Sequence, residues 1–149
     1  MAGIDISLLG DEALSKLLAR LSGPVQRRVV SKAMRASAKR IQGHVVSNLS
    51  GSPVHVRSGD LRAAFSGARV RAGKGKRGVI RLGIEWPTRD KLGIAADDPY
   101  FYPTAIEYGH ARASAKPFMR PAVDDHESEE HRRIGSEIGA GIESEAGRT

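Results

Sequence analysis

Apolar residues recur every three or four positions over a long stretch near the start of the chain. This spacing predicts an amphipathic helix over about 24–48, with Pro24 at its first position, where the missing N–H would have no helical partner in any case. Leucines at helical spacing before Ser22 predict a shorter helix from Asp11, so the two form a helical pair over 11–48. The expected buried face of the longer helix carries Val25, Val29, Ala33, Ser37, Ile41 and Val45, with Val30, Met34 and Ala38 beside them.

Alternation of apolar and polar residues predicts strands in two regions. The sequence IDISLL alternates in this way and indicates an N-terminal strand over 1–9. Farther along, 61–71 and 77–85 resemble two strands joined by the turn-rich sequence GKGKRG, which predicts a hairpin over 61–86. A long loop over 87–101 follows it.

The last third of the chain predicts helices. An apolar run that ends at Glu107 and Tyr108 is compatible with a strand or a helical turn within 100–108, and we favour a short helix there. A C-terminal helix is expected over 120–145, where glycines that each cost up to about 1 kcal/mol relative to alanine interrupt a narrow apolar stripe, so this helix needs a partner surface. We therefore expect one α+β domain over 1–149, with an antiparallel β-sheet packed by a long α-helix, a C-terminal helix and extended loops.

Charge is divided unevenly along the chain, whose net charge is +7. Residues 24–81 carry 14 Lys and Arg against the single acid Asp60, whereas residues 82–149 carry 8 basic and 13 acidic residues. A basic face could approach nucleic acid and gain affinity by counterion release. It could equally meet the acidic part of a neighbouring copy head to tail, a geometry that closes rings.

Several kinds of chemistry lack their residues or spacing. The chain has no cysteine, which excludes disulfides, thiolate metal sites and a cysteine nucleophile. We expect neither a membrane span nor a signal peptide, because long apolar runs and a basic N-terminal segment are missing. The sequence HESEEH separates its histidines by five positions instead of the four of a zinc-binding HExxH helix, and GKGKRG lacks the phosphate-loop spacing. We expect no catalytic, cofactor-binding or metal-binding residues.

Two basic segments are candidate contacts for an anionic partner. The cations of the helix over 24–48 form a solvated face, a nucleic-acid contact or a contact with an acidic protein. The hairpin region supplies our candidates for exposed contacts with DNA or with an acidic partner: Arg69, Lys74, Lys76 and Arg77. A sequence-nonspecific nucleic-acid-binding module, using the helix over 24–48 or the hairpin tip over 73–78, is the alternative function.

Three ordered segments resemble a known family. RSGDLRAAF (57–65), YPTAIEYGH (102–110) and AKPFMRPA (115–122) are similar to the TG-x-LR-x-S, Y-A-x-x-V-E-F/Y-G-T and P-F-L/M-R-P-A segments of the phage tail-component family typified by the tenth gene product of phage HK97. The chain departs from that pattern at three positions: Ser58 stands for Thr, Pro103 for Ala and His110 for Thr.

The resemblance implies a structural virion protein of a long-tailed phage, without enzymatic activity or a cofactor. It implies an oligomeric ring, sixfold or twelvefold, at the head–tail connection, assembled in the cytoplasm of the bacterial host. Its partners would be other neck, head-completion and tail-tube or terminator proteins. Such a ring surrounds the DNA passage, so part of the basic excess could line the lumen.

The sequence over 105–122 predicts a rigid corner ahead of the last helix. Gly109 permits a turn where a side chain would clash, and Arg120 carries a guanidinium suited to a carboxylate, with Glu107 as the candidate. We predict that this corner sets the geometry between neighbouring subunits and holds no reactant. Its residues are Glu107, Tyr108, Gly109, Phe118, Arg120 and Pro121.

Overall fold

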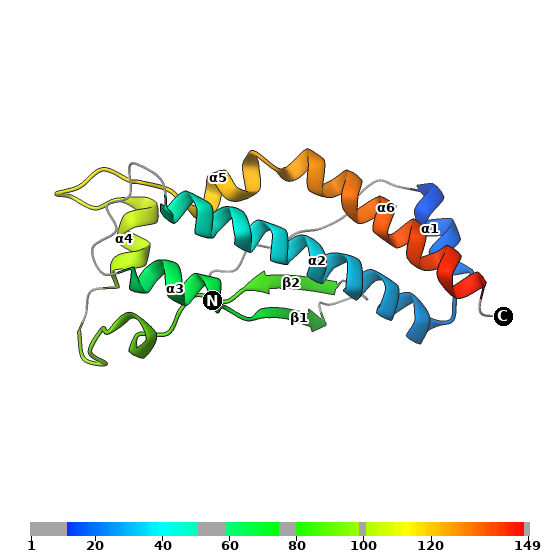
Figure 1. Ribbon diagram of the computed structural model, residues 1–149, viewed down its shortest axis with the longest axis horizontal. Helices are drawn as coiled ribbons and strands as arrows, with labels where there is room; N and C mark the ends of the chain where they lie inside the picture. The colour runs from blue at the N-terminus through cyan, green and yellow to red at the C-terminus, as the bar shows by residue number, and fades with distance from the viewer. Residues whose placement is uncertain (1–11, 51–58, 75–79, 99–100, 148–149) are drawn as a thin grey trace.

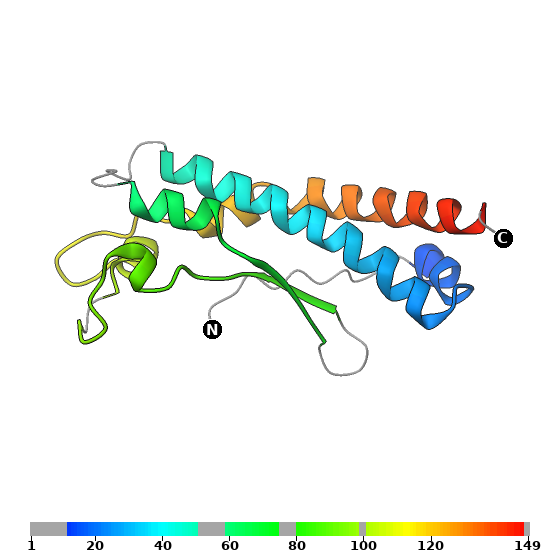
Figure 2. The same cartoon turned by 60° about the horizontal axis from the view of Figure 1, so that its bottom comes forward.

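The molecule is elongated and mainly helical. The computed structural model describes residues 12–50, 59–74, 80–98 and 101–147 (Figure 1). Its long axis follows α2, a 28-residue helix over Gly23–Ser50, with α6 (Glu127–Ala146) along one side and a two-stranded hairpin along the other (Figure 2). The remaining elements are α1 (Glu12–Ala19), α3 (Asp60–Ser66), β1 (Val70–Lys74), β2 (Ile80–Ile84), the 3-10 turn η2 (Asp90–Leu92), α4 (Tyr102–Tyr108) and α5 (Met119–Asp124).

The expected α+β class is wrong, because helices dominate and the strand pairing among the described residues is limited to one short hairpin. β1 and β2 pair antiparallel, with Val70 opposite Ile84 and Lys74 opposite Ile80. The helical pair expected over 11–48 corresponds to α1 and α2. The N-terminal strand expected over 1–9 lies outside the described residues.

The segment 61–66, expected as the start of a strand, is the helix α3. Leu61, Ala64 and Phe65 are buried on one face of this helix, and this spacing of three and four positions suits a helix better than the period of two of a strand. Gly59 precedes the helix with a φ of 81°, a left-handed conformation that turns the chain into it. The hairpin is therefore shorter than the predicted 61–86.

The C-terminal helix expected over 120–145 is broken into α5 and α6 at Asp125 and His126. His126 has a φ of −117° and a ψ of −1°, which departs from the helical φ at the bend. The break lets α5 pack against the C-terminal half of α2 while α6 runs back along its N-terminal half (Figure 1). The partner surface that the glycine-rich α6 needs is therefore α2.

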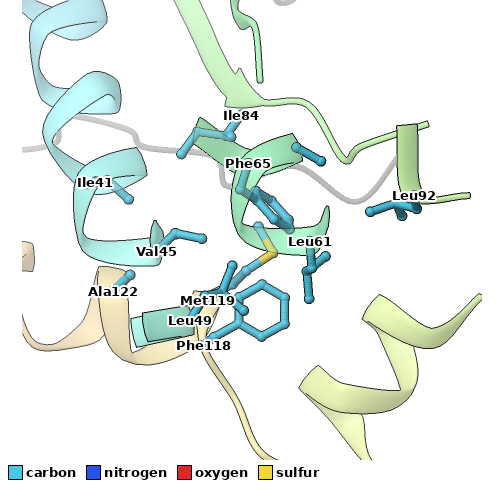
Figure 3. Packing of buried hydrophobic residues seen from close by; sticks show 11 residues of the cluster. Ile41, Val45, Leu49, Leu61, Phe65, Ile84, Leu92, Phe118, Met119 and Ala122 are labelled. Atoms are coloured by element: carbon cyan, nitrogen blue, oxygen red, sulfur yellow. The ribbon is translucent and has the colours of Figure 1, made fainter. Parts of the chain in front are cut away.

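Two hydrophobic clusters lie along α2. One joins Val29, Ala33, Met34 and Ala38 of α2 to Ile134 and Ile138 of α6. The second lies around α3 and α5 (Figure 3) and contains Ile41, Val45, Leu49, Leu61, Ala64, Phe65, Ile84, Leu92, Phe118, Met119 and Ala122.

Close helix packing explains one glycine of α6. A Cβ at Gly141 would lie 2.7 Å from Cγ1 of Val29, so the helices approach closely because position 141 has no side chain. A side chain at position 141 would require Val29 or α6 to move, although glycine lowers the local helix propensity.

The loop expected over 87–101 is ordered by a short turn over its described part. Leu92 of η2 is 4% exposed and packs into the second cluster. The N–H of Ile94 donates to the carbonyl of Arg89 at 2.8 Å, and the Arg89 guanidinium lies 5.7 Å from the centre of the Phe101 ring.

Among the described helices, none is both long enough and apolar enough to cross a lipid bilayer.

Candidate functional site

The corner expected over 105–122 is a compact unit at one end of the molecule. α4 and α5 meet there beside α3 and the C-terminal end of α2 (Figures 1 and 3). Parts of the three segments that carry the family resemblance meet in this unit, since α3, α4 and α5 all contribute to one hydrophobic cluster. Residues 57 and 58 of the first segment lie outside the described residues.

Glu107 is the buried centre of the corner, with 1% of its surface exposed. One carboxylate oxygen, Oε2, accepts hydrogen bonds from the backbone N–H groups of Phe118 and Met119 at 2.8 and 2.9 Å. The other, Oε1, accepts from the backbone N–H of Arg120 at 3.0 Å and from its Nε at 3.2 Å. The first N–H groups of a helix lack partners within that helix, so Glu107 caps α5 from another helix.

Arg120 joins the inside of the corner to its surface. In addition to its contact with the Glu107 carboxylate, its Nη2 donates to the Glu107 backbone carbonyl at 3.0 Å. Its guanidinium carbon lies 5.4 Å from the centre of the Tyr108 ring, a cation–π distance. The Arg120 side chain is 54% exposed and Tyr108 is 58% exposed. The sequence-based pairing of Arg120 with Glu107 is confirmed.

Gly109 makes the turn after α4 possible. Its φ of 76° is in the region that favours glycine, and a Cβ would lie 2.7 Å from the backbone nitrogen of Ala115. The loop that follows reverses direction, and His110 and Ala113 exchange two backbone hydrogen bonds across it. The chain then comes back to α4, where the N–H of Lys116 donates to the carbonyl of Ile106 at 2.8 Å. A side chain at position 109 would force this loop open.

Phe118 forms the inner side of the corner. Its ring is fully buried, with its centre 5.5 Å from that of Phe65 and 6.3 Å from that of Trp86. Its backbone carbonyl accepts a hydrogen bond from Nδ2 of Asn48 at 3.0 Å, which ties the corner to the end of α2. Pro121 is half-buried in the first turn of α5, two residues after the helix begins at Met119.

Two side-chain amides that the sequence reasoning missed hold this end of the molecule together. Besides Asn48, Nε2 of Gln42 donates to the carbonyls of Phe65 and Ala68 at 2.6 and 2.9 Å, at the C-terminal end of α3. Gln42 is 7% exposed. The sequence could have indicated this role, because Gln42 follows Ile41 on the apolar face of α2 and a polar residue buried on such a face needs hydrogen-bond partners.

Of the four predicted basic contacts, the structure describes Arg69 and the backbone of Lys74. Arg69 is exposed just before β1 and borders a pocket of about 210 Å³ that Trp86 and Lys91 also line. Lys74 is the last residue of β1. Lys76 and Arg77 lie outside the described residues.

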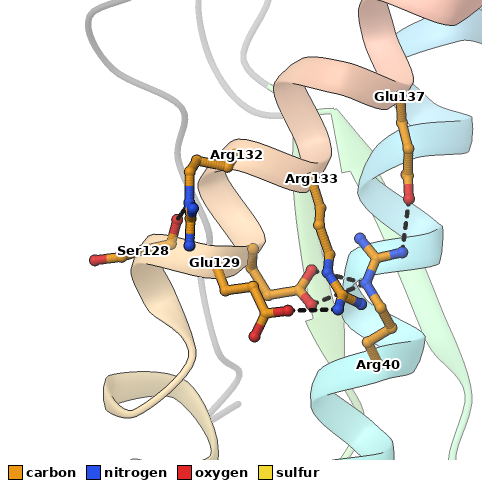
Figure 4. Close-up of polar contacts among 7 residues, drawn as sticks. Arg40, Ser128, Glu129, Arg132, Arg133 and Glu137 are labelled. Carbon is orange, nitrogen blue, oxygen red and sulfur yellow. Dashed lines mark hydrogen bonds and ion pairs between the residues drawn. The ribbon is translucent and has the colours of Figure 1, made fainter.

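A second polar centre joins α2 to α6. Nε of Arg40 donates to both carboxylate oxygens of Glu130, at 2.8 and 3.0 Å, and Nη1 donates to Glu137 at 2.7 Å (Figure 4). Burial by itself would raise the pKa of Glu130, whose side chain is 4% exposed. The hydrogen bond from Arg40, followed by Ser37 and by the charges of Arg40 and Arg133, outweighs burial and holds that pKa below its usual value. The hydrogen bond to Glu130 raises the pKa of Arg40 in turn.

Two histidine rings stack where α5 gives way to α6. The centres of the His44 and His126 rings lie 3.5 Å apart, with 12° between their planes. Burial first, and the neighbouring His126 second, lower the pKa of His44 from its usual 6.5, and the charge of Arg133 acts in the same direction. Glu129 and Glu130 act against this shift.

Acidification is expected to destabilise the protein through His44. Because its pKa is lower in the folded state, the unfolded chain binds the proton more readily, and the contribution of His44 to stability is complete above pH 6.5. It is lost as the pH falls through the folded-state pKa. Thermal unfolding between pH 8 and pH 5 measures this loss. His44→Gln should flatten that dependence, and an unchanged dependence in this variant would contradict the assignment to His44.

The two polar centres have the same chemical character. The carboxylates of Glu107 and Glu130 are both buried, and N–H donors of the protein surround them. Over the described part of the chain, no group of three His, Asp or Glu side chains is placed to hold a metal ion. What the geometry provides is a rigid support that presents Tyr108 and Arg120 at the surface.

No family model, curated protein or solved structure matches this chain.

Proposed function

We propose that this chain is a structural virion protein of a long-tailed phage and forms a ring at the head–tail connection, around the DNA passage. One observation carries the proposal: segments that resemble the phage tail-component family pack into a single corner, although more than 35 residues separate the first from the second. The corner joins a buried inner side, Phe65 and Phe118, to an exposed pair, Tyr108 and Arg120.

The exposed pair is well suited to a contact between subunits. Tyr and Arg are among the side chains that contribute most to protein–protein binding, and little conformational entropy is lost when such groups are already fixed before binding. Glu107 fixes Arg120, and Arg120 lies over the Tyr108 ring. The proposed contact therefore uses a surface that needs no rearrangement. No reaction is proposed, since N–H donors of the protein already occupy the buried carboxylates.

The mass of the purified protein, alone and mixed with neck and tail-tube proteins, tests this function. We expect a closed ring, and Tyr108→Ser should weaken the subunit contact about 30-fold, the effect of losing an interface residue that contributes about 2 kcal/mol. Leu17→Ser is the matched control, because Leu17 is also a large exposed apolar residue (42%) but lies on α1 at the opposite end of the molecule (Figure 1).

Two results would contradict the proposal. A protein that stays monomeric at high concentration and binds none of the neck or tail proteins has no such function. If the ring forms equally well with Tyr108→Ser, the contact between subunits does not involve the corner.

A further inference from the structure

The cations of α2 fall into two groups that the sequence does not distinguish. α2 contains six Lys and Arg residues and no acidic residue. Arg40 is half-buried in its contacts with Glu130 and Glu137, and Arg28 pairs with Glu145 at 2.6 Å while remaining 60% exposed. The other four are exposed and make no ion pair with any residue that the structure describes: Arg27, Lys32, Arg35 and Lys39.

Four of the exposed cations form a line on α2. Arg28, Lys32, Arg35 and Lys39 are separated by four, three and four residues, so at 100° per residue they lie within an arc of about 60°. At 1.5 Å per residue the line is about 16 Å long. Its centre lies opposite Ser37, which is fully buried, so these side chains extend from the side of α2 that faces away from the core. We call these four residues the α2 basic stripe.

The composition of the stripe suits a linear polyanion better than a protein partner. A protein interface generally depends on aromatic or large apolar side chains in well-packed pockets beside its charges. Beside the stripe such side chains are missing: the large hydrophobic residues that are exposed among the described residues are Leu17 and Tyr108, and neither lies on α2. Neighbouring Gly43 has open space where a Cβ would be. A nucleic-acid backbone requires only closely spaced cations along a line, since each cation that neutralises a phosphate releases a counterion.

We propose that the α2 basic stripe binds the phosphate backbone of double-stranded DNA without sequence preference. The α2 backbone holds the four cations in register, and Lys and Arg contacts with phosphate carry no sequence information. The sequence left the helix over 24–48 and the hairpin open as nucleic-acid contacts; this inference places the contact on the helix and limits it to four of its cations, rather than on Arg69 and the hairpin. It also stands apart from the corner at Glu107, so either proposal can fail without the other.

The salt dependence of duplex binding tests the proposal. Fluorescence anisotropy would follow a labelled 30-base-pair duplex titrated with the full chain at 50, 100 and 200 mM salt. Affinity should fall about 40-fold between 50 and 200 mM salt if Arg28 stays paired with Glu145 and three cations neutralise phosphates, and about 150-fold if Arg28 leaves Glu145 and contacts a phosphate as well. The triple variant Lys32→Gln, Arg35→Gln and Lys39→Gln should bind weakly and lose only about threefold over that range. Gln has nearly the same helix propensity as Lys and Arg, so α2 should stay folded, and thermal unfolding checks this.

A matched variant separates the stripe from net charge. Substituting Arg62, Arg112 and Arg132 by Gln removes the same charge from exposed positions outside α2. This control should keep the binding and the salt dependence of the parent protein. If both triple variants lost DNA affinity equally, net charge alone would attract DNA, and the proposal would be overturned.

Two further outcomes would also overturn it. The first is a parent protein that does not bind the duplex at 50 mM salt. The second is a stripe variant that binds DNA normally but no longer self-associates. In that case the stripe contacts the acidic surface of a second copy, where Asp124, Asp125, Glu127 and Glu129 are exposed. If instead the variant loses DNA binding and keeps the mass of the parent assembly, DNA binding is separate from ring formation.

Discussion

Replacing Glu107 by alanine is expected to destabilise the protein by about 3–5 kcal/mol, because three backbone N–H groups lose their acceptor at about 1–3 kcal/mol each. The carboxylate accepts hydrogen bonds from three backbone N–H groups at the start of α5 and from Nε of Arg120. Glu107 is 1% exposed. Without it, these donors have no partner in a site that solvent hardly reaches. Urea unfolding followed by circular dichroism measures the free-energy difference.

Two comparison variants separate the cap from the ion pair. Glu107→Gln keeps the volume but turns an amide NH₂ toward N–H donors, so it should lose most of the stability that alanine loses. Arg120→Ala should lose only about 1 kcal/mol, because the Arg120 side chain is 54% exposed and water screens its charge. If Arg120→Ala were as damaging as Glu107→Ala, the ion pair and not the helix cap would hold the corner.

Replacing Arg40 by methionine is expected to destabilise the protein by about 3–5 kcal/mol at neutral pH. The variant leaves the Glu130 carboxylate buried without the guanidinium that pairs with it in the parent protein. The pKa of Glu130 should then rise, since burial remains and the favourable charge is gone. In the parent protein, the contribution of Glu130 is complete above its usual pKa of 4.5 and is lost as the pH falls through the lower folded-state value. The two proteins should therefore become more similar in stability at acidic pH.

The double variant Arg40→Met with Glu130→Leu is the control for this prediction. Replacing both partners of a buried ion pair by apolar residues of similar volume is often neutral for stability. The double variant should recover most of the loss, and Glu137, whose side chain is 35% exposed, can turn to solvent. Chemical unfolding of the parent protein, Arg40→Met, Glu130→Leu and the double variant at pH 7 and pH 4 completes the cycle. A double variant less stable than Arg40→Met would contradict the unpaired carboxylate as the cause.

The corner was largely predictable because its determinants are local. A glycine that must adopt a positive φ, prolines around Phe118, and an arginine near an acidic residue all lie between 105 and 122. The structure bears out the turn at Gly109 and the pair of Arg120 with Glu107. The three hydrogen bonds that Glu107 accepts from backbone N–H groups were not predicted, because these bonds depend on where α5 begins relative to α4.

The fold class was mispredicted where local patterns were ambiguous. Leu61, Ala64 and Phe65 occur in a short segment that a basic, glycine-rich stretch follows, and we interpreted the whole as two long strands. The spacing of these three residues fits a helix, which buries them against α2 and α5. A segment of seven residues carries too few periods for the sequence to decide between a helix and a strand.

The sequence by itself determined α2, the turn at Gly109 and the unequal distribution of charge, because each follows from the spacing or the type of neighbouring residues. Only the tertiary structure decided which cations of α2 are used internally, where the C-terminal helix breaks, and that His44 stacks on His126. The physical reason is separation along the chain: Arg40 and Glu130 are 90 residues apart, and Arg28 and Glu145 are 117 apart. Periodicity shows which face of a helix is apolar, but the packing of α6 on α2 determines which charged side chains meet.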